Sequence, residues 1–100
     1  MILNQLEIPE EAVKEFCGRH KVSELSLFGS FVSGGAQASS DLDILVQFKP
    51  DAHVGFVEMS RMRGELSRIF GKEVDLVPKN GLKEVIRAGV LSSALVIYAE

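Results

Sequence analysis

Residues 22–48 read VSELSLFGSFVSGGAQASSDLDILVQF, and this stretch decides the fold. Its two ends, residues 22–28 and 41–48, carry apolar side chains at alternate positions, which is typical of half-buried β-strands. Gly29 breaks the first strand, and a short helical segment follows over residues 30–36 before a polar loop. The stretch therefore predicts a strand, a short helix, a loop and a second strand.

The segment before this stretch predicts a helix, and the segment after it predicts a longer one. Pro9 followed by two glutamates is a helix start, because proline suits the first turn and acids suit the positive end of the helix dipole. Residues 55–70 carry apolar side chains at steps of three and four, which indicates an amphipathic helix. Gly71 stands where its C-terminal cap is expected.

The C-terminal third predicts two further strands around one helix. Residues 73–77 and 94–98 contain enough apolar and β-branched residues to form strands. Asn80 is positioned to cap the helix between them. We therefore expect an α/β (α+β) chain that forms a single domain over residues 1–100. Its core would be a small mixed β-sheet of about four strands with helices packed on one face.

Composition and charge exclude several functional classes. The chain has 46% hydrophobic and 25% charged residues and a net charge of −3, as in an ordinary globular protein. The negative net charge argues against direct binding to the phosphate backbone of a nucleic acid, because such binding needs clustered cations. Cys17 is the only cysteine, so no disulfide can form within the chain. Neither a long apolar run nor a leader-like N-terminus is present, so we expect a cytoplasmic protein without a membrane segment.

Three aspartates on two of the predicted strands indicate a metal-binding site. Asp41 and Asp43 are two residues apart and leave the same face of one strand, while Asp75 lies on another strand whose aliphatic residues face the other way. If the two strands are neighbours, the carboxylates converge. Such convergence is unfavourable without a counter-ion, and Mg²⁺, which prefers oxygen ligands, removes the conflict.

Structural explanations compete with this one. Asp41 could equally shape a turn, whereas Asp43 and Asp75 interrupt apolar strands, where aspartate is disfavoured. The pair Gly29-Ser30 is more often a plain turn or helix cap than a phosphate site when it occurs alone.

The spacing of these elements carries a family resemblance. Gly29-Ser30, ten intervening residues and then Asp41-Leu42-Asp43 resemble the signature of the minimal nucleotidyltransferase (MNT) family, the smallest form of the DNA polymerase β-like nucleotidyltransferases. The likeness covers about residues 22–77 and extends through Gly34, Ala36, Ser40, residues 44–46 and Asp75.

The resemblance assigns a role to each of these residues. It implies a polymerase β-like nucleotidyltransferase fold in which Asp41, Asp43 and Asp75 are catalytic and bind Mg²⁺, as two ions, with Asp75 as metal ligand or general base. Gly29, Ser30 and Ser40 would bind the nucleotide. The family usually has Arg at the position of Ser33, so this chain lacks a cation near the nucleotide loop.

The resemblance also implies a reaction and a partner. It implies transfer of AMP from ATP to a hydroxyl of a protein partner, as in some family members, and the role of an antitoxin that thereby silences a small helical HEPN-domain toxin, an RNase. Two alternatives stay open: a catalytically weakened nucleotide- or partner-binding antitoxin, and a nucleotidyltransferase that acts on RNA ends. A plain interaction module with incidental acids is a further possibility, and an oligomer is compatible with the sequence.

Overall fold

The computed structural model describes residues 2–3, 6–33 and 41–100. The elements in chain order are β1 (Ile2–Leu3), β2 (Leu6–Glu7), α1 (Glu10–Arg19), β3 (Val22–Phe28), α2 (Ser30–Ser33), β4 (Leu42–Phe48), α3 (Phe56–Phe70), β5 (Val74–Pro78), the 3₁₀ helix η1 (Lys79–Gly81), α4 (Glu84–Ser93) and β6 (Leu95–Ala99). From α1 to β6, the predicted alternation of helices and strands is confirmed.

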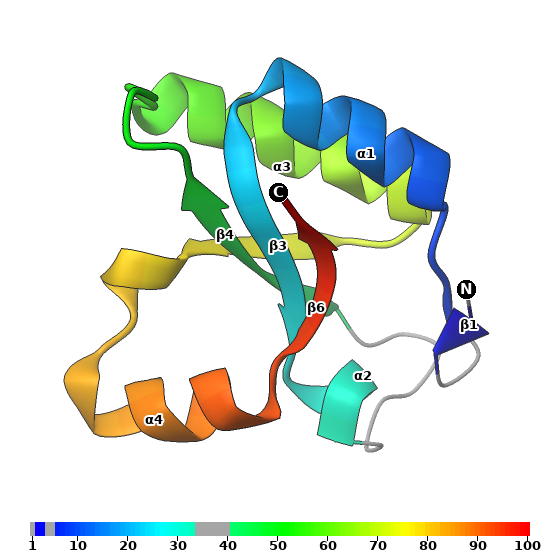
Figure 1. Ribbon diagram of the computed structural model, residues 1–100. Helices are drawn as coiled ribbons and strands as arrows, with labels where there is room; N and C mark the ends of the chain where they lie inside the picture. The colour runs from blue at the N-terminus through cyan, green and yellow to red at the C-terminus, as the bar shows by residue number, and fades with distance from the viewer. Residues whose placement is uncertain (1, 4–5, 34–40) are drawn as a thin grey trace.

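The main sheet has the strand order β5-β4-β3-β6 (Figure 1). β3 pairs antiparallel with both β4 and β6, whereas β4 pairs parallel with β5. The parallel pair requires a crossover between its strands, and α3 provides it. The mixed sheet of four strands is therefore confirmed, and β4, which carries Asp43, is one of its two central strands.

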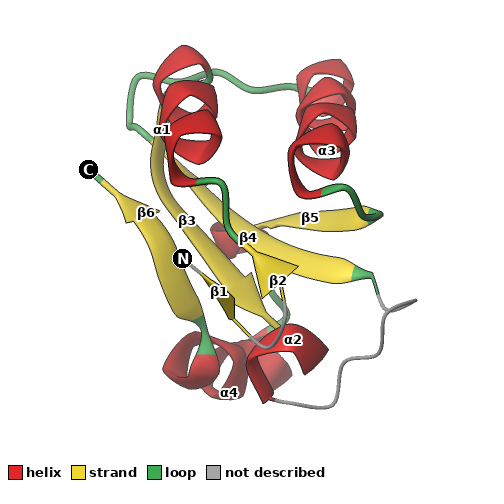
Figure 2. Cartoon of the chain, turned by 90° about the vertical axis from the view of Figure 1, so that its right-hand side faces the viewer, coloured by secondary structure: helices red, strands yellow, loops and turns green. Residues whose placement is uncertain are grey.

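Helices α1 and α3 lie together over one face of this sheet (Figure 2). The smaller helices α2 and α4 lie on the other side, at the bottom of both views. The α+β class is confirmed. The second face of the sheet is left with polar side chains near both ends of β4, and it is the face that concerns function.

The core fills the space between the sheet and the helix pair α1 and α3. α1 contributes Val13, Phe16 and Cys17, and α3 contributes Met62, Leu66 and Phe70, all of them buried. The strand residues that complete the core include Leu25, Leu27, Leu42, Ile44 and Val46, each no more than 1% exposed. Cys17 is thus part of the apolar core, where a cysteine behaves as a small hydrophobic residue.

The structure corrects two details of the sequence analysis. Asn80 does not cap α4, because it belongs to η1 and an extended Leu82 separates it from the helix, whose N-cap is Lys83. The two-residue strands β1 and β2, an antiparallel pair, were not predicted. Strands this short carry no periodic signal. Gly71 does end α3 in the left-handed conformation, with φ 68°. Among the described residues, no helix combines the length and apolar character needed to cross a membrane.

Candidate active site

The parallel pairing of β4 with β5 brings two of the three aspartates together. Asp43 and Asp75 are direct partners in the register. Paired residues of neighbouring strands leave the same face of the sheet, with Cα atoms about 5 Å apart. Asp41 precedes β4 and is exposed, on the same side of the strand as Asp43 by alternation. The side chains of all three point away from the face covered by α1 and α3.

Hydrogen bonds from α3 and β4 fix the start of β5 and hence the place of Asp75. The Arg63 side chain donates through Nε to the Val74 carbonyl at 2.9 Å, and the Val74 N–H donates to Ser67 Oγ at 3.1 Å. On the other side of the strand, the Leu42 N–H donates to the Glu73 carbonyl at 2.9 Å. Both edges of the strand are therefore held just before Asp75.

Gly29 packs closely against the carboxylate of Asp43. The register pairs Phe28 with Asp43, so the turn after β3 comes directly beside this side chain. Gly29 has φ 78°, and a Cβ atom built on it would overlap Asp43 Oδ2 and lie 3.1 Å from Asp43 Cγ. Only glycine fits, because it tolerates the left-handed backbone and leaves the space that the carboxylate occupies.

Of the two serines predicted to bind the nucleotide, the structure describes one. Ser30 is the first residue of α2, and the Val32 N–H donates to the Gly29 carbonyl at 3.1 Å, which closes the first turn. Within the described residues α2 ends at Ser33, so the helical segment expected over residues 30–36 is traced only for its first part. Ser40 lies outside the described residues.

Neighbouring carboxylates determine the electrostatics of the site. Burial, and then the neighbouring charges of Asp75 and Asp41, raise the pKa of Asp43 above its usual value. The same crowding favours a bound cation, since a divalent ion would cancel the repulsion. No set of three or more acidic, histidine or cysteine side chains among the described residues forms a ready metal cage. The predicted trio of Asp41, Asp43 and Asp75 is thus not gathered as a three-ligand group, and the strand register brings Asp43 and Asp75 together as a pair.

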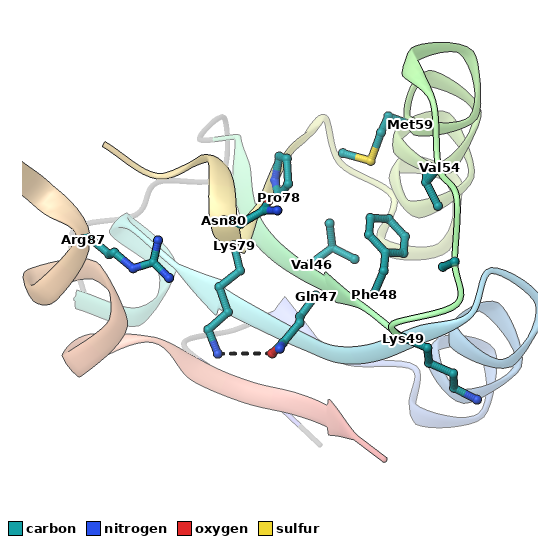
Figure 3. A pocket seen from close by; sticks show the side chains of 11 residues that line it. Val46, Gln47, Phe48, Lys49, Val54, Met59, Pro78, Lys79, Asn80 and Arg87 are labelled. Atoms are coloured by element: carbon teal, nitrogen blue, oxygen red, sulfur yellow. Dashed lines mark hydrogen bonds between the residues drawn. The ribbon is translucent and has the colours of Figure 1, made fainter. Parts of the chain in front are cut away.

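A cavity of about 730 Å³ opens at the far end of β4 and β5 (Figure 3). Its polar side includes Gln47, Lys79 and Arg87, none of which was predicted as a site residue. Lys79 follows Asp75 by four residues, so the period of a strand would have placed both on one side of the sheet. Arg87 comes from α4, and no sequence signal connects it with this place.

Comparison with known proteins agrees with this geometry. The family described as "Nucleotidyltransferase domain" matches residues 9–97. The chain is 38% identical over 85 residues to the protein adenylyltransferase MntA of Thermococcus cleftensis, covering 84% of this chain and 83% of that protein.

Two solved structures share the fold at lower identity. One is a toxin–antitoxin with AMP-PNP (TM-score 0.75, 20% identity, covering 93% of this chain and 75% of that one). The other is the tri-AMPylated HEPN toxin of Shewanella oneidensis in complex with MNT antitoxin (TM-score 0.66, 18% identity, 91% and 70%). Because the family match spans residues 9–97 and the Thermococcus relative is an adenylyltransferase, the chain belongs to the nucleotidyltransferase domain family and is an enzyme of that class.

Proposed function

We propose that this chain transfers AMP from ATP to a hydroxyl group of a protein partner, and that the partner is a HEPN toxin that the transfer silences. The observation that carries the proposal is the pairing of Asp43 with Asp75 across β4 and β5, with Gly29 packed against Asp43. The adenylyltransferase name of the Thermococcus relative supports AMP as the transferred group. With ATP as substrate, we place the reaction in the cytoplasm.

Each site residue has a task in this reaction. Asp41, Asp43 and Asp75 would hold Mg²⁺ as an open set of oxygen ligands that the triphosphate completes. Bound Mg²⁺, as two ions, would neutralise charge on the transferring phosphate and align the attacking and leaving oxygens. Gly29 and Ser30 would hold the triphosphate by backbone N–H groups, with Ser40 at the same loop. As the alternative to binding metal, Asp75 would accept the proton of the attacking hydroxyl.

The partner is supported by the family and by charge. A related MNT antitoxin has been solved with a tri-AMPylated HEPN toxin. This chain has a net charge of −3, which suits a basic partner surface. The same charge disfavours an RNA acceptor, whose phosphates would be repelled.

The proposal is tested by incubating the chain with a HEPN toxin, Mg²⁺ and ATP labelled on either the α- or the γ-phosphate. We expect α-label, and no γ-label, to appear on the toxin, with mass increments of whole AMP units. Asp43→Asn should abolish the labelling. Asp51→Asn is the matched control, because Asp51 lies in the exposed turn after β4 with its side chain 70% exposed.

Three outcomes would contradict the proposal. Transfer of the γ-label would indicate a kinase. Undiminished labelling by Asp43→Asn would remove the carboxylate pair from the mechanism. Nucleotide binding without any transfer to toxin would leave a binding antitoxin instead of an enzyme that acts on this partner.

A further inference from the structure

Helix α4 exposes apolar side chains to solvent. None of its ten residues is buried. Val85 is 89% exposed and Ile86 is 50% exposed, and Val96 in the adjoining strand β6 is 48% exposed. A helix this short gains most of its stability from burying one face, so α4 lacks the packing that would stabilise it. Exposed apolar groups that lie together mark a surface for interaction.

The exposed residues of α4 that follow Glu84 form one face without charge. They span less than half of the helix circumference, and the half-buried Arg87, Val90 and Leu91 lie opposite them. The residues of this outer face are Val85, Ile86, Ala88, Gly89, Ser92 and Ser93. The solvent side of an ordinary surface helix is polar and charged, whereas the centre of a protein interface is depleted of charge.

Gly89 leaves space on the outer face that the fold itself does not use. A Cβ atom built on Gly89 would meet nothing within 4 Å. Glycine inside a helix lowers the stability of that helix relative to alanine, so this residue is unfavourable for α4 alone. A partner whose surface approaches the helix backbone closely would make use of the space.

The register of β6 places the C-terminal end of α4 near the carboxylates. Leu95, two residues after the helix, pairs with Leu27 of β3, and the next residue of β3, Phe28, pairs with Asp43. The start of β6 is therefore separated from β4 by two strand spacings, or roughly 10 Å. α4 also lies on the side of the sheet opposite α1 and α3, which is the side to which the carboxylates point (Figure 2).

This position identifies the occupant of the outer face under the proposed function. The acceptor protein must bring a hydroxyl group to the carboxylates of Asp43 and Asp75. A protein–protein interface covers about 800 Å² on each partner, which corresponds to a patch roughly 30 Å across. The helix α4 is only about 15 Å long. An acceptor seated over the carboxylates therefore also reaches α4.

We propose that the outer face of α4 is the docking surface for the acceptor protein and receives an uncharged, apolar patch of it. The inference rests on the proposed function and names the surface by which the enzyme holds its protein substrate. Because this face has no charge, docking on it removes water from no ion, whereas an acceptor that presents a charged group there is rejected. The net charge of −3 attracts a basic acceptor from a distance, and α4 adds a short-range apolar contact.

The test compares Val85→Glu with the matched control Val57→Glu. Each valine is the second residue of its helix, α4 or α3, and the two are 89% and 66% exposed. A glutamate at this position suits the positive end of the helix dipole, so both variants should fold, as circular dichroism checks. Only Val85 belongs to the outer face of α4, since α3 covers the opposite side of the sheet (Figure 2).

Binding of the HEPN toxin is measured by calorimetry without ATP, and transfer is measured as the initial rate with α-labelled ATP. In Val85→Glu we expect the dissociation constant for the toxin to rise by about tenfold or more, because a charge enters an apolar interface. The KM for the toxin should rise with it, while kcat and the KM for ATP stay unchanged. Val57→Glu should match wild type in all four quantities.

A second variant, Gly89→Leu, separates docking from stability. Leucine forms helices better than glycine, so this variant should melt at a higher temperature than wild type. Its side chain fills the space over residue 89, so the affinity for the toxin should fall by about tenfold. A purely structural role of α4 would not produce these opposite changes.

Three results would overturn the docking surface. Equal toxin affinity in Val85→Glu and wild type would show that the acceptor docks elsewhere. Equal losses of affinity in the two glutamate variants would show that the effect is not specific to α4. A wild-type dimer in sedimentation that Val85→Glu dissociates, with toxin affinity unchanged, would assign the outer face to a second copy of this chain.

Failure of the proposed function gives a different result. If wild type binds the toxin but transfers no AMP to it, the proposed reaction is contradicted, and the affinities of the variants still decide whether α4 is the docking surface. A wild type that does not bind the toxin at all would contradict both proposals.

Discussion

Gly29→Ala should damage both the stability and the activity of this enzyme, and Gly71→Ala separates the two causes. Both glycines have positive φ, 78° and 68°, so alanine at either position costs about 1–2 kcal/mol of backbone strain. Nothing lies within 4 Å of a Cβ on Gly71, whereas a Cβ on Gly29 would overlap the Asp43 carboxylate. Moving that carboxylate adds an overpacking cost of roughly 1–3 kcal/mol.

The assay is thermal unfolding together with AMP transfer. At about 4–8 °C of melting temperature per kcal/mol for a domain of this size, Gly29→Ala should melt clearly below Gly71→Ala. It should also lose transfer, because its Asp43 carboxylate is displaced, while Gly71→Ala keeps it. Combining Gly29→Ala with Asp43→Ala removes the overlap, so the two stability losses should be non-additive. Equal melting temperatures for the two single variants, with transfer intact in both, would refute the reasoning.

Three further predictions follow from the electrostatics. Asp43→Asn should stabilise the metal-free protein at neutral pH by roughly 1 kcal/mol, since it removes a partly buried charge and its repulsion from Asp75 and Asp41. The pKa of Asp43 is raised in the folded state, so this advantage should disappear as the pH falls and Asp43 is protonated; a constant difference in denaturant titrations would argue against it. Glu65→Gln should remove a contribution to folding stability that wild type loses at low pH. Hydrogen bonds with Arg19 lower the pKa of Glu65, and their stabilisation is lost as the pH falls through that pKa. An acid-unfolding profile in the variant like that of wild type would disprove this. Burial raises the pKa of Cys17 to about 12, so a thiol reagent at pH 8 should label it only after unfolding, as mass spectrometry can check.

Much of the fold could be predicted because its signals are local and periodic. The alternation in residues 41–48 identified β4, and the stripe over residues 55–70 identified α3, whose observed bounds are Phe56–Phe70. The order of elements followed from these patterns. The expectation that Asn80 caps a helix was wrong because asparagine suits a 3₁₀ turn as well as a helix start. The residue type alone therefore does not distinguish the two positions.

The site was predictable to the extent that it lies on strands. Alternation placed Asp43 and Asp75 opposite the aliphatic side of each strand, and the parallel register then made them direct partners. The contact between Gly29 and Asp43 depends on how two strands are registered, which spacing alone does not determine. Arg87 reaches its cavity from a helix with no buried residue, so no apolar pattern fixes where it points.

The crossover through α3 joins the two halves of the acidic centre, and it therefore couples ligand affinity to the folding of the chain. Asp43 and Asp75 are neighbours only after α3 has docked and β5 has aligned with β4. An unfolded chain holds these acids far apart and has no binding centre, so a nucleotide that binds the native state protects it by mass action. In a cell, a nucleotide substrate would then also stabilise the folded protein.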